Sequence, residues 1–329
     1  MEGKKAFKIL SIDGGGIKGL YSSTILQVLE ERYKCKTYEC FDMLCGTSTG
    51  GLIALALSSG KTAKEISDMY VYHGESIFPQ KWNRLLKQIF GGGKYTNKFL
   101  KNHLHSFFGD KTLNDSENLL CIPSFNYTES KTCVFKFDHK EGGLARDKAI
   151  KYVDVALATS AAPTYFPICE IEELNKQYID GGVWANNPAL IGVIEALCYF
   201  VRKDKEYDSI QVLSISSIDI HTGKSLEKNI NKGAIQWGLD TLNPFMKGQV
   251  QFPHNSLKLL AEHSDLNIEY KRIESPKISK KQEKSIGMDK VSPKSIELLQ
   301  GLAKSMADDC FRDKDIEKFF TTQKTYKTK

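Results

Sequence analysis

Short apolar runs alternate along the chain with longer segments in which apolar residues recur every three or four positions. Such runs have the length of buried strands, and the recurring spacing is that of one face of a helix. The predicted strands are 7–12, 41–45, 119–125, 132–137, 178–180, 210–215 and 266–273. The predicted helices are 20–29, 52–57, 63–70, 152–159, 188–200, 235–242, 252–263 and 294–310.

The alternation of strands with helices predicts an α/β fold layered around a mostly parallel sheet. A less regular region at 73–115 interrupts it. Because no stretch rich in proline, glycine or serine divides the chain, we expect residues 1–329 to form a single domain. Its glycine motifs lie in a core at about 7–200, helices and a strand follow at 201–312, and a basic tail ends the chain at 313–329.

The composition is ordinary for a globular protein, with 41% hydrophobic and 26% charged residues. No apolar stretch approaches the roughly eighteen residues of a membrane-spanning helix. The first residues run directly into the predicted strand at 7–12, which leaves no room for the apolar part of a secretory signal. We therefore expect a cytoplasmic protein.

The eight cysteines predict neither a disulfide framework nor a metal site. There is no C-x-x-C pair, and the five-residue steps within 35–45 match no zinc pattern. Cys45, Cys133 and Cys198 lie in apolar runs, so we expect them to be reduced and buried.

The formal net charge is +6, and lysines are concentrated toward the C-terminus. They lie in a loop-like stretch at 277–294 and at the end of the chain, at positions 324, 327 and 329. One interpretation is a solvated surface with a frayed tail. The other is attraction to anionic lipid headgroups or to a phosphate-bearing ligand.

Two glycine-framed turns carry most of the chemical information. Residues 13–19 (DGGGIKG) and 46–50 (GTSTG) each follow a predicted strand and open a predicted helix. The first turn leaves backbone N–H groups at a helix N-terminus, where negative charge is stabilised. The second projects the hydroxyl of Ser48 from a sharp bend. Together they predict an oxyanion cradle beside a nucleophile, as acyl transfer requires.

Other assignments of these turns fit less well. The first turn also matches the dinucleotide fingerprint G-x-G-x-x-G, which requires an acidic residue at the end of the second strand. That strand ends instead in the sequence CGTS at 45–48. An ordinary α/β-hydrolase would have several strands before its nucleophile, whereas Ser48 has one besides its own. A nucleotide- or phosphate-binding protein using Gly14–Gly19 remains the alternative function.

A serine nucleophile needs a base within hydrogen-bond reach. No histidine lies in a glycine- or proline-framed turn that would fix it as that base. Asp180 is the best-placed carboxylate, because it ends a short strand and Gly181 and Gly182 let the turn approach closely. The alternative for Asp180 is an ordinary turn or cap aspartate.

At this point the residues resemble a known family, the patatin-like phospholipases. Four blocks appear in the order of that family: 10–19 (LSIDGGGIKG), 46–51 (GTSTGG), 161–167 (AAPTYFP) and 180–182 (DGG). The resemblance covers the chain from about Phe7 to Phe200. It implies a three-layer α/β/α fold related to the catalytic domains of cytosolic phospholipases A2.

The resemblance also implies roles for individual residues. Ser48 would be the nucleophile and Asp180 its base, without histidine, metal or organic cofactor. The backbone N–H groups of Gly14, Gly15 and Gly16 would stabilise the oxyanion. The supporting motif positions are Asp13, Gly19, Gly46, Gly50, Gly181 and Gly182. The substrates would be acyl esters of membrane glycerophospholipids or related lipids, and a non-catalytic storage or interaction protein is the alternative within the family.

Two further expectations concern access and control. Segment 81–108 begins with a basic amphipathic pattern followed by Gly91-Gly92-Gly93, which is typical of a lid, of a membrane-surface element or of an ordinary surface helix. Some bacterial members of the family stay inactive until a cyclic oligonucleotide made during phage infection binds. The size and basic C-terminal third of this chain are compatible with that antiviral subgroup. We expect no DNA or RNA partner.

Overall fold

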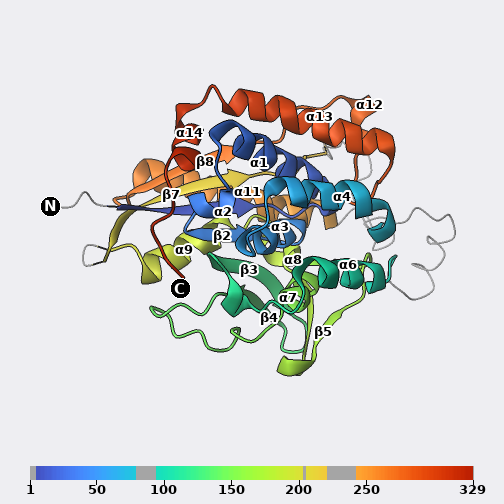
Figure 1. The fold of residues 1–329 in the computed structure, drawn as a ribbon, viewed down its shortest axis with the longest axis horizontal. Helices are drawn as coiled ribbons and strands as arrows, with labels where there is room; N and C mark the ends of the chain where they lie inside the picture. The colour runs from blue at the N-terminus through green and yellow to red at the C-terminus, as the bar shows by residue number, and fades with distance from the viewer. Residues whose placement is uncertain (1–4, 79–93, 203–204, 221–241, 329) are drawn as a thin grey trace, which may run out of the picture.

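The computed structural model describes residues 5–78, 94–202, 205–220 and 242–328 (Figure 1). Its centre is an eight-stranded sheet in the order β5-β6-β3-β2-β1-β7-β8, with β4 paired to β3. The strands are β1 (Lys5–Ile12), β2 (Met43–Gly46), β3 (Leu119–Asn126), β4 (Lys131–Lys136), β5 (Cys169–Ile171), β6 (Lys176–Asp180), β7 (Tyr207–Ile215) and β8 (Ile268–Ile273).

Helices cover both faces of this sheet. The described helices are α1 (Gly19–Tyr33), α2 (Thr37–Cys40), α3 (Thr49–Ser58), α4 (Ala63–Ile77), α6 (Lys98–Phe108), α7 (Tyr152–Ser160), α8 (Gly182–Ala185), α9 (Ala189–Tyr199), α11 (Leu242–His263), α12 (Lys280–Glu283), α13 (Pro293–Cys310) and α14 (Lys314–Thr321). Helices α1, α3, α4 and α13 pack together in one layer, and α9 and α11 lie in the other (Figure 1). The predicted three-layer α/β/α fold is thus confirmed.

The sheet is mixed rather than uniformly parallel. Strands β3, β2, β1, β7 and β8 run parallel to one another. Strands β4, β5 and β6 pair antiparallel at the other side. The difference arises because β3 turns directly back into β4, whereas the parallel strands are joined through helices.

The central strands are buried on both faces, as parallel strands between two helical layers must be. Every residue of β1 from Phe7 to Ile12 and every residue of β2 is buried. This explains why both read as continuous apolar runs rather than as alternating patterns. None of the helices in the ranges given above is both long enough and apolar enough to cross a bilayer.

Several expectations need correction. The region 73–115 is more regular than predicted, because α4 continues to Ile77 and α6 buries Leu100, Leu104 and Phe108 at four-residue spacing. Cys198 is exposed, whereas Cys45 and Cys133 are buried as predicted. The cysteines in the described ranges are free thiols. The helix predicted at 235–242 lies outside the described residues except for Leu242, at which α11 begins.

The end of the chain is folded rather than frayed. Helix α14 buries Ile316, Phe319 and Phe320, and the segment after it is bound to Asp42, the residue that precedes β2. There the backbone N–H groups of Thr325 and Tyr326 donate to Asp42 Oδ1 at 2.8 and 2.7 Å. The segment predicted as a basic tail therefore contributes to the core, because its apolar residues outweigh its lysines in packing.

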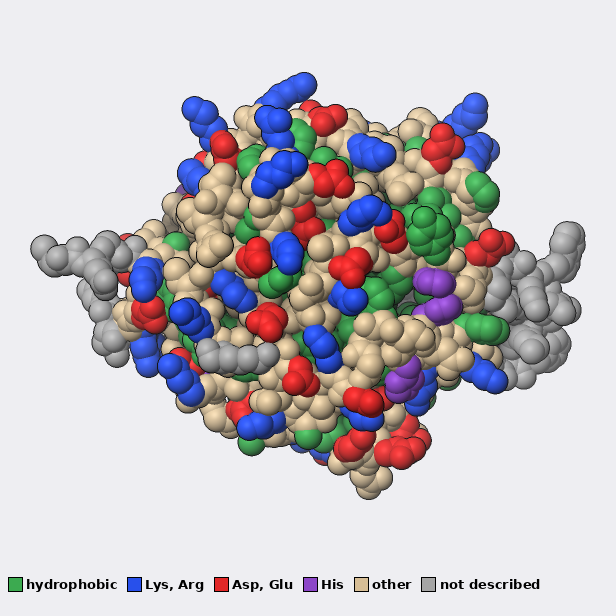
Figure 2. Space-filling model, viewed as in Figure 1, with side chains coloured by type: hydrophobic (Ala, Val, Ile, Leu, Met, Phe, Trp, Pro, Cys, Tyr) green, Lys and Arg blue, Asp and Glu red, His purple; other side chains and the backbone are tan. Residues whose placement is uncertain are grey.

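On the face of the molecule that Figure 2 shows, lysine and arginine side chains do not gather into one basic patch. On the face shown in Figure 2, basic and acidic side chains are interspersed. The stretch predicted as a loop at 277–294 contains the short helix α12 and the first residues of α13. The charge distribution on this face alone therefore identifies no partner.

Candidate active site

The two glycine turns lie side by side because β1 and β2 are adjacent and parallel. Ile12, the last residue of β1, is in register with Gly46, the last residue of β2. A Cβ atom built on Gly14 would lie 3.2 Å from the Cβ of Ser48. The sheet therefore brings the first turn against the serine, because adjacent parallel strands end at the same edge of the sheet.

Ser48 lies in a strained bend between β2 and α3. Its φ of 55° and ψ of −123° are unusual for a residue with a side chain. The bend is tight: a Cβ on Gly46 would lie 2.1 Å from Gly50 O, and one on Gly50 would lie 2.2 Å from Ile12 O. Glycine is therefore required at both positions that flank the serine turn.

Asp180 is the hydrogen-bond partner of this serine. Ser48 Oγ donates to Asp180 Oδ2 at 2.7 Å, and Gly182 N donates to Asp180 Oδ1 at 2.7 Å. Both side chains are buried, with residue exposures of 7% for Ser48 and 4% for Asp180. Burial raises the pKa of Asp180 to about 6, and the bonds from Ser48 and Gly182 oppose that rise.

The loops around Asp180 fix its position. Asp180 N donates to Ala161 O at 3.0 Å, which holds the backbone of Asp180 against the start of the 161–167 block. A Cβ on Gly181 would lie 2.2 Å from Pro123 O of the neighbouring strand β3. Only glycine allows the chain to turn this close to β3.

The first turn supplies two free donors rather than three. Gly14 N donates to Asn186 O at 3.1 Å, so this N–H group is already engaged. No hydrogen bond within the described ranges uses the N–H groups of Gly15 or Gly16. Gly16 has a φ of +63°, and a Cβ there would lie 2.1 Å from Met288 O. The N–H groups of this turn that remain free in this conformation are therefore those of Gly15 and Gly16.

Asp13 opens this turn, and its side chain forms a buried ion pair. Arg272 Nη2 donates to Asp13 Oδ2 at 2.6 Å and Arg272 Nη1 to Asp13 Oδ1 at 3.3 Å. The exposures of the two side chains are 4% and 1%. Arg272 also donates to Ser214 Oγ at 2.6 Å. The pair joins the first turn to β7 and β8, while Gly19 lets α1 start against Thr49.

Replacing Arg272 by Met is expected to destabilise the protein by about 3–5 kcal/mol, because the buried Asp13 carboxylate loses its counter-charge. Urea unfolding of the purified variant measures this loss. The double variant Asp13→Asn/Arg272→Met should recover much of it, since the lone charge is gone. Arg312→Met removes an 82% exposed arginine and should change stability by less than about 0.5 kcal/mol. An Arg272→Met variant as stable as the wild type would contradict the assignment of Arg272 as the counter-charge of buried Asp13.

Asn186 is a site residue that the sequence analysis missed. It is buried, and its Oδ1 atom has no hydrogen-bond partner among the described residues. A Cβ on Gly182 would lie 3.1 Å from Asn186 Oδ1 and 3.1 Å from Asp180 Oδ1. The two oxygens thus flank the same space above Gly182. A buried acceptor without a donor inside a reactive site is available to a substrate or to water.

Histidine plays no part in the described site. Neither Ser48 nor Asp180 bonds to any of the histidines in the described ranges. His139, the most buried of these, lies beside Glu195 instead, with His139 Nε2 and Glu195 Oε1 3.2 Å apart. The same part of the chain holds no group of three or more side chains that could ligate a metal.

The segment proposed as a lid is described only in part. Residues 81–93, which carry its amphipathic pattern, lie outside the described ranges. Lys94 N and Tyr95 N donate to Thr164 O and Tyr165 O at 2.9 and 2.7 Å, so the described part begins bound to the 161–167 block. It then continues into α6, which packs against α7 and α4.

The chain is similar in sequence to a family of known proteins. Residues 10–193 match the family model of the patatin-like phospholipases. A cGAMP-activated phospholipase of Escherichia coli is 29% identical over 96% of this chain and 93% of its own length. A cGAMP-activated phospholipase of Pseudomonas aeruginosa is 32% identical over 70% of each chain. Patatin-like protein 2 of Oryza sativa is 33% identical over 74% of this chain and 67% of its own.

Proposed function

Because the chain belongs to the patatin-like phospholipase family, we propose that it hydrolyses fatty-acyl esters of membrane glycerophospholipids through Ser48 and Asp180. The observation that carries this proposal is the 2.7 Å hydrogen bond from Ser48 Oγ to Asp180 Oδ2 in a buried site. We further propose that the protein is cytoplasmic and acts at the membrane surface, where its substrates are.

In the first half of the reaction, Asp180 accepts the proton of Ser48 as Ser48 Oγ attacks the ester carbonyl. The carbonyl oxygen becomes an oxyanion and accepts hydrogen bonds from the N–H groups of Gly15 and Gly16. Each such donor typically contributes about 10²–10³ in rate. Asp180 then protonates the departing lysophospholipid oxygen, which leaves a fatty acyl ester on Ser48.

In the second half, water attacks the acyl-enzyme. One hydrogen of this water goes to Asp180 as its oxygen bonds to the acyl carbon. The second hydrogen of the water needs a hydrogen-bond acceptor within the protein, because the site is buried. Asn186 Oδ1 is an acceptor without a donor, and it lies on the same side of Gly182 as Asp180 Oδ1. Asp180 returns its proton to Ser48, and the fatty acid leaves.

The pH dependence of kcat/KM should follow Asp180. Its pKa is raised by burial to about 6, and only the deprotonated carboxylate can accept the serine proton. Below that pH the rate should fall by about tenfold per pH unit, and above it the rate should level off. Initial rates of a soluble short-chain ester between pH 4.5 and 8 measure this, with circular dichroism at each pH as the folding control. A rate that stays flat down to pH 4.5 would rule out Asp180 as the base.

Replacing Asn186 by Leu should slow deacylation more than acylation, by about 10²-fold, since the attacking water loses an acceptor. With p-nitrophenyl butyrate, the variant should release about one equivalent of nitrophenol and then stall. Intact-protein mass spectrometry should find the acyl group on it. Asn187→Ser, at the neighbouring buried asparagine with partners of its own, should alter stability but not this partition. If acylation and deacylation slowed equally in Asn186→Leu, the role of Asn186 as acceptor for the attacking water would be contradicted.

The function itself is tested by fatty-acid release. Purified protein is incubated with phosphatidylcholine–phosphatidylglycerol vesicles, and fatty acid and lysophospholipid are quantified by mass spectrometry.

Because two of the relatives compared above are named cGAMP-activated phospholipases, we propose that a cyclic oligonucleotide switches the reaction on in antiviral defence. The assay is therefore run with and without cGAMP. Absence of release in both conditions would reject the proposal. Thermal stabilisation by cGAMP without lipolysis, unchanged in Ser48→Ala, would favour a nucleotide-binding protein.

A further inference from the structure

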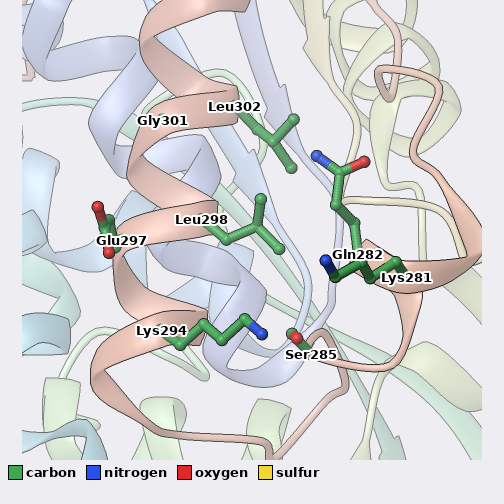
Figure 3. A pocket seen from close by; sticks show the side chains of 8 residues that line it. All are labelled: Lys281, Gln282, Ser285, Lys294, Glu297, Leu298, Gly301 and Leu302. Carbon is green, nitrogen blue, oxygen red and sulfur yellow. The ribbon is translucent and has the colours of Figure 1, made fainter.

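A groove of about 480 Å³ lies between α12 and α13, apart from the dyad. Its lining residues are Lys281, Gln282, Ser285, Lys294, Glu297, Leu298, Gly301 and Leu302 (Figure 3). Pockets for small ligands commonly have volumes of roughly 300–1,000 Å³. The groove is thus large enough for a nucleotide-sized or headgroup-sized ligand.

The chemistry of the lining favours an anion with apolar parts. Leu298 and Leu302 project from α13 toward α12, while Glu297 points away from them (Figure 3). The two lysines, Lys281 and Lys294, stand on opposite helices and form no ion pair with a carboxylate in the described ranges. An apolar surface between these two lysines suits a ligand in which a ring or an alkyl chain carries a phosphodiester group.

The groove is connected to the first glycine turn by the loop that leaves α12. Met288, in that loop, accepts a hydrogen bond from Ile17 N at 2.8 Å, and its carbonyl occupies the place of a side chain on Gly16. At the other end, Ser295 Oγ of α13 donates to Lys290 O at 3.0 Å. A ligand that changes the separation of α12 and α13 therefore displaces a loop that touches a predicted oxyanion donor.

We propose that this groove binds a phosphodiester anion and that its occupancy sets the position of the glycine turn through Met288. The inference rests on the proposed function, because it assigns a regulatory site to the same reaction. Both a cyclic dinucleotide and a phospholipid headgroup carry the required phosphodiester. The site also gives a role to the lysine-rich stretch 277–294, which the dyad leaves unexplained.

The binding test compares two charge-reversal pairs in the full-length chain. The groove variant is Lys281→Glu/Lys294→Glu, and the matched control is Lys304→Glu/Lys314→Glu, at exposed lysines that do not line the groove. cGAMP binding is measured by isothermal titration calorimetry, and phosphatidylglycerol vesicle binding by co-sedimentation. We expect the groove variant to lose at least about tenfold in affinity for one of these probes, and the control to bind like the wild type.

The pattern of results decides the source of the ligand. Selective loss of cGAMP binding identifies a soluble nucleotide, and selective loss of vesicle binding identifies a lipid headgroup. The proposal is overturned if the wild type binds neither probe, if the groove variant binds both like the wild type, or if both variants lose affinity equally.

Coupling between the groove and the glycine turn is measured by amide hydrogen exchange of residues 14–19, with and without the probe (cGAMP or vesicles) that binds the wild type. We expect a change in exchange in the wild type that is absent from the groove variant. Binding without any change at 14–19 would overturn the coupling. Ser48→Ala is measured in parallel and should bind and respond like the wild type. Failure of the groove is thus distinguished from failure of the hydrolase, which would appear as absent lipolysis with intact binding.

Discussion

Replacing Ser48 by Ala, or Asp180 by Asn, is expected to lower fatty-acid release by about 10⁴-fold or more. The first change removes the nucleophile, and the second keeps the shape of the side chain but removes its ability to take a proton. Each residue depends on the other, so the two losses should be similar and should not add in the double variant. The loss of activity in each variant is measured by fatty-acid release from vesicles and by hydrolysis of a soluble ester.

The control for this prediction is a buried serine elsewhere. Ser22, in α1, is 1% exposed, and its hydroxyl has no hydrogen-bond partner among the described residues. Ser22→Ala should therefore retain activity, and melting curves should show all three single variants folded. Turnover near the wild-type rate in Ser48→Ala or Asp180→Asn would reject the dyad.

The second large effect is expected at the glycine turn, where Gly16→Ala should reduce kcat by about 10²–10³. The new Cβ would lie 2.1 Å from Met288 O, and the φ of +63° is itself unfavourable for alanine. The turn must shift, and the N–H groups of Gly15 and Gly16 would then no longer point at the developing oxyanion. Steady-state kinetics with a soluble ester, which needs no membrane, measure kcat directly.

Gly109→Ala separates backbone strain from the effect on the site. Gly109 has a similar φ of +60°, but nothing lies within 4 Å of a Cβ built there. The variant should lose about 1 kcal/mol of stability and keep its kcat. If Gly16→Ala kept its kcat as well, the first turn would not hold the oxyanion.

Local patterns made much of the fold predictable. The buried strands and the glycine turns are encoded within stretches of a few residues, so their places at adjacent strand ends could be anticipated. Helix α14 was missed because lysines and acidic residues dominate its composition. The spacing of Ile316, Phe319 and Phe320 on one face would have indicated it.

The supporting residues of the site could not be predicted in this way. Arg272 meets Asp13 across 259 positions of sequence, and Asn186 reaches Gly14 across 172. A single sequence holds no local signal for such pairs, because the sheet order that joins them is a property of the whole fold. The engagement of the Gly14 N–H group by Asn186 O was missed for the same reason.

The most direct measurement is covalent labelling with a fluorophosphonate probe, followed by peptide mapping of the modified residue. The proposed mechanism predicts one phosphonyl group per chain, attached to Ser48, and labelling at least about 10²-fold slower in Asp180→Asn. Absence of labelling in wild-type protein shown to be folded and supplied with cGAMP, or labelling at a different serine, would contradict it.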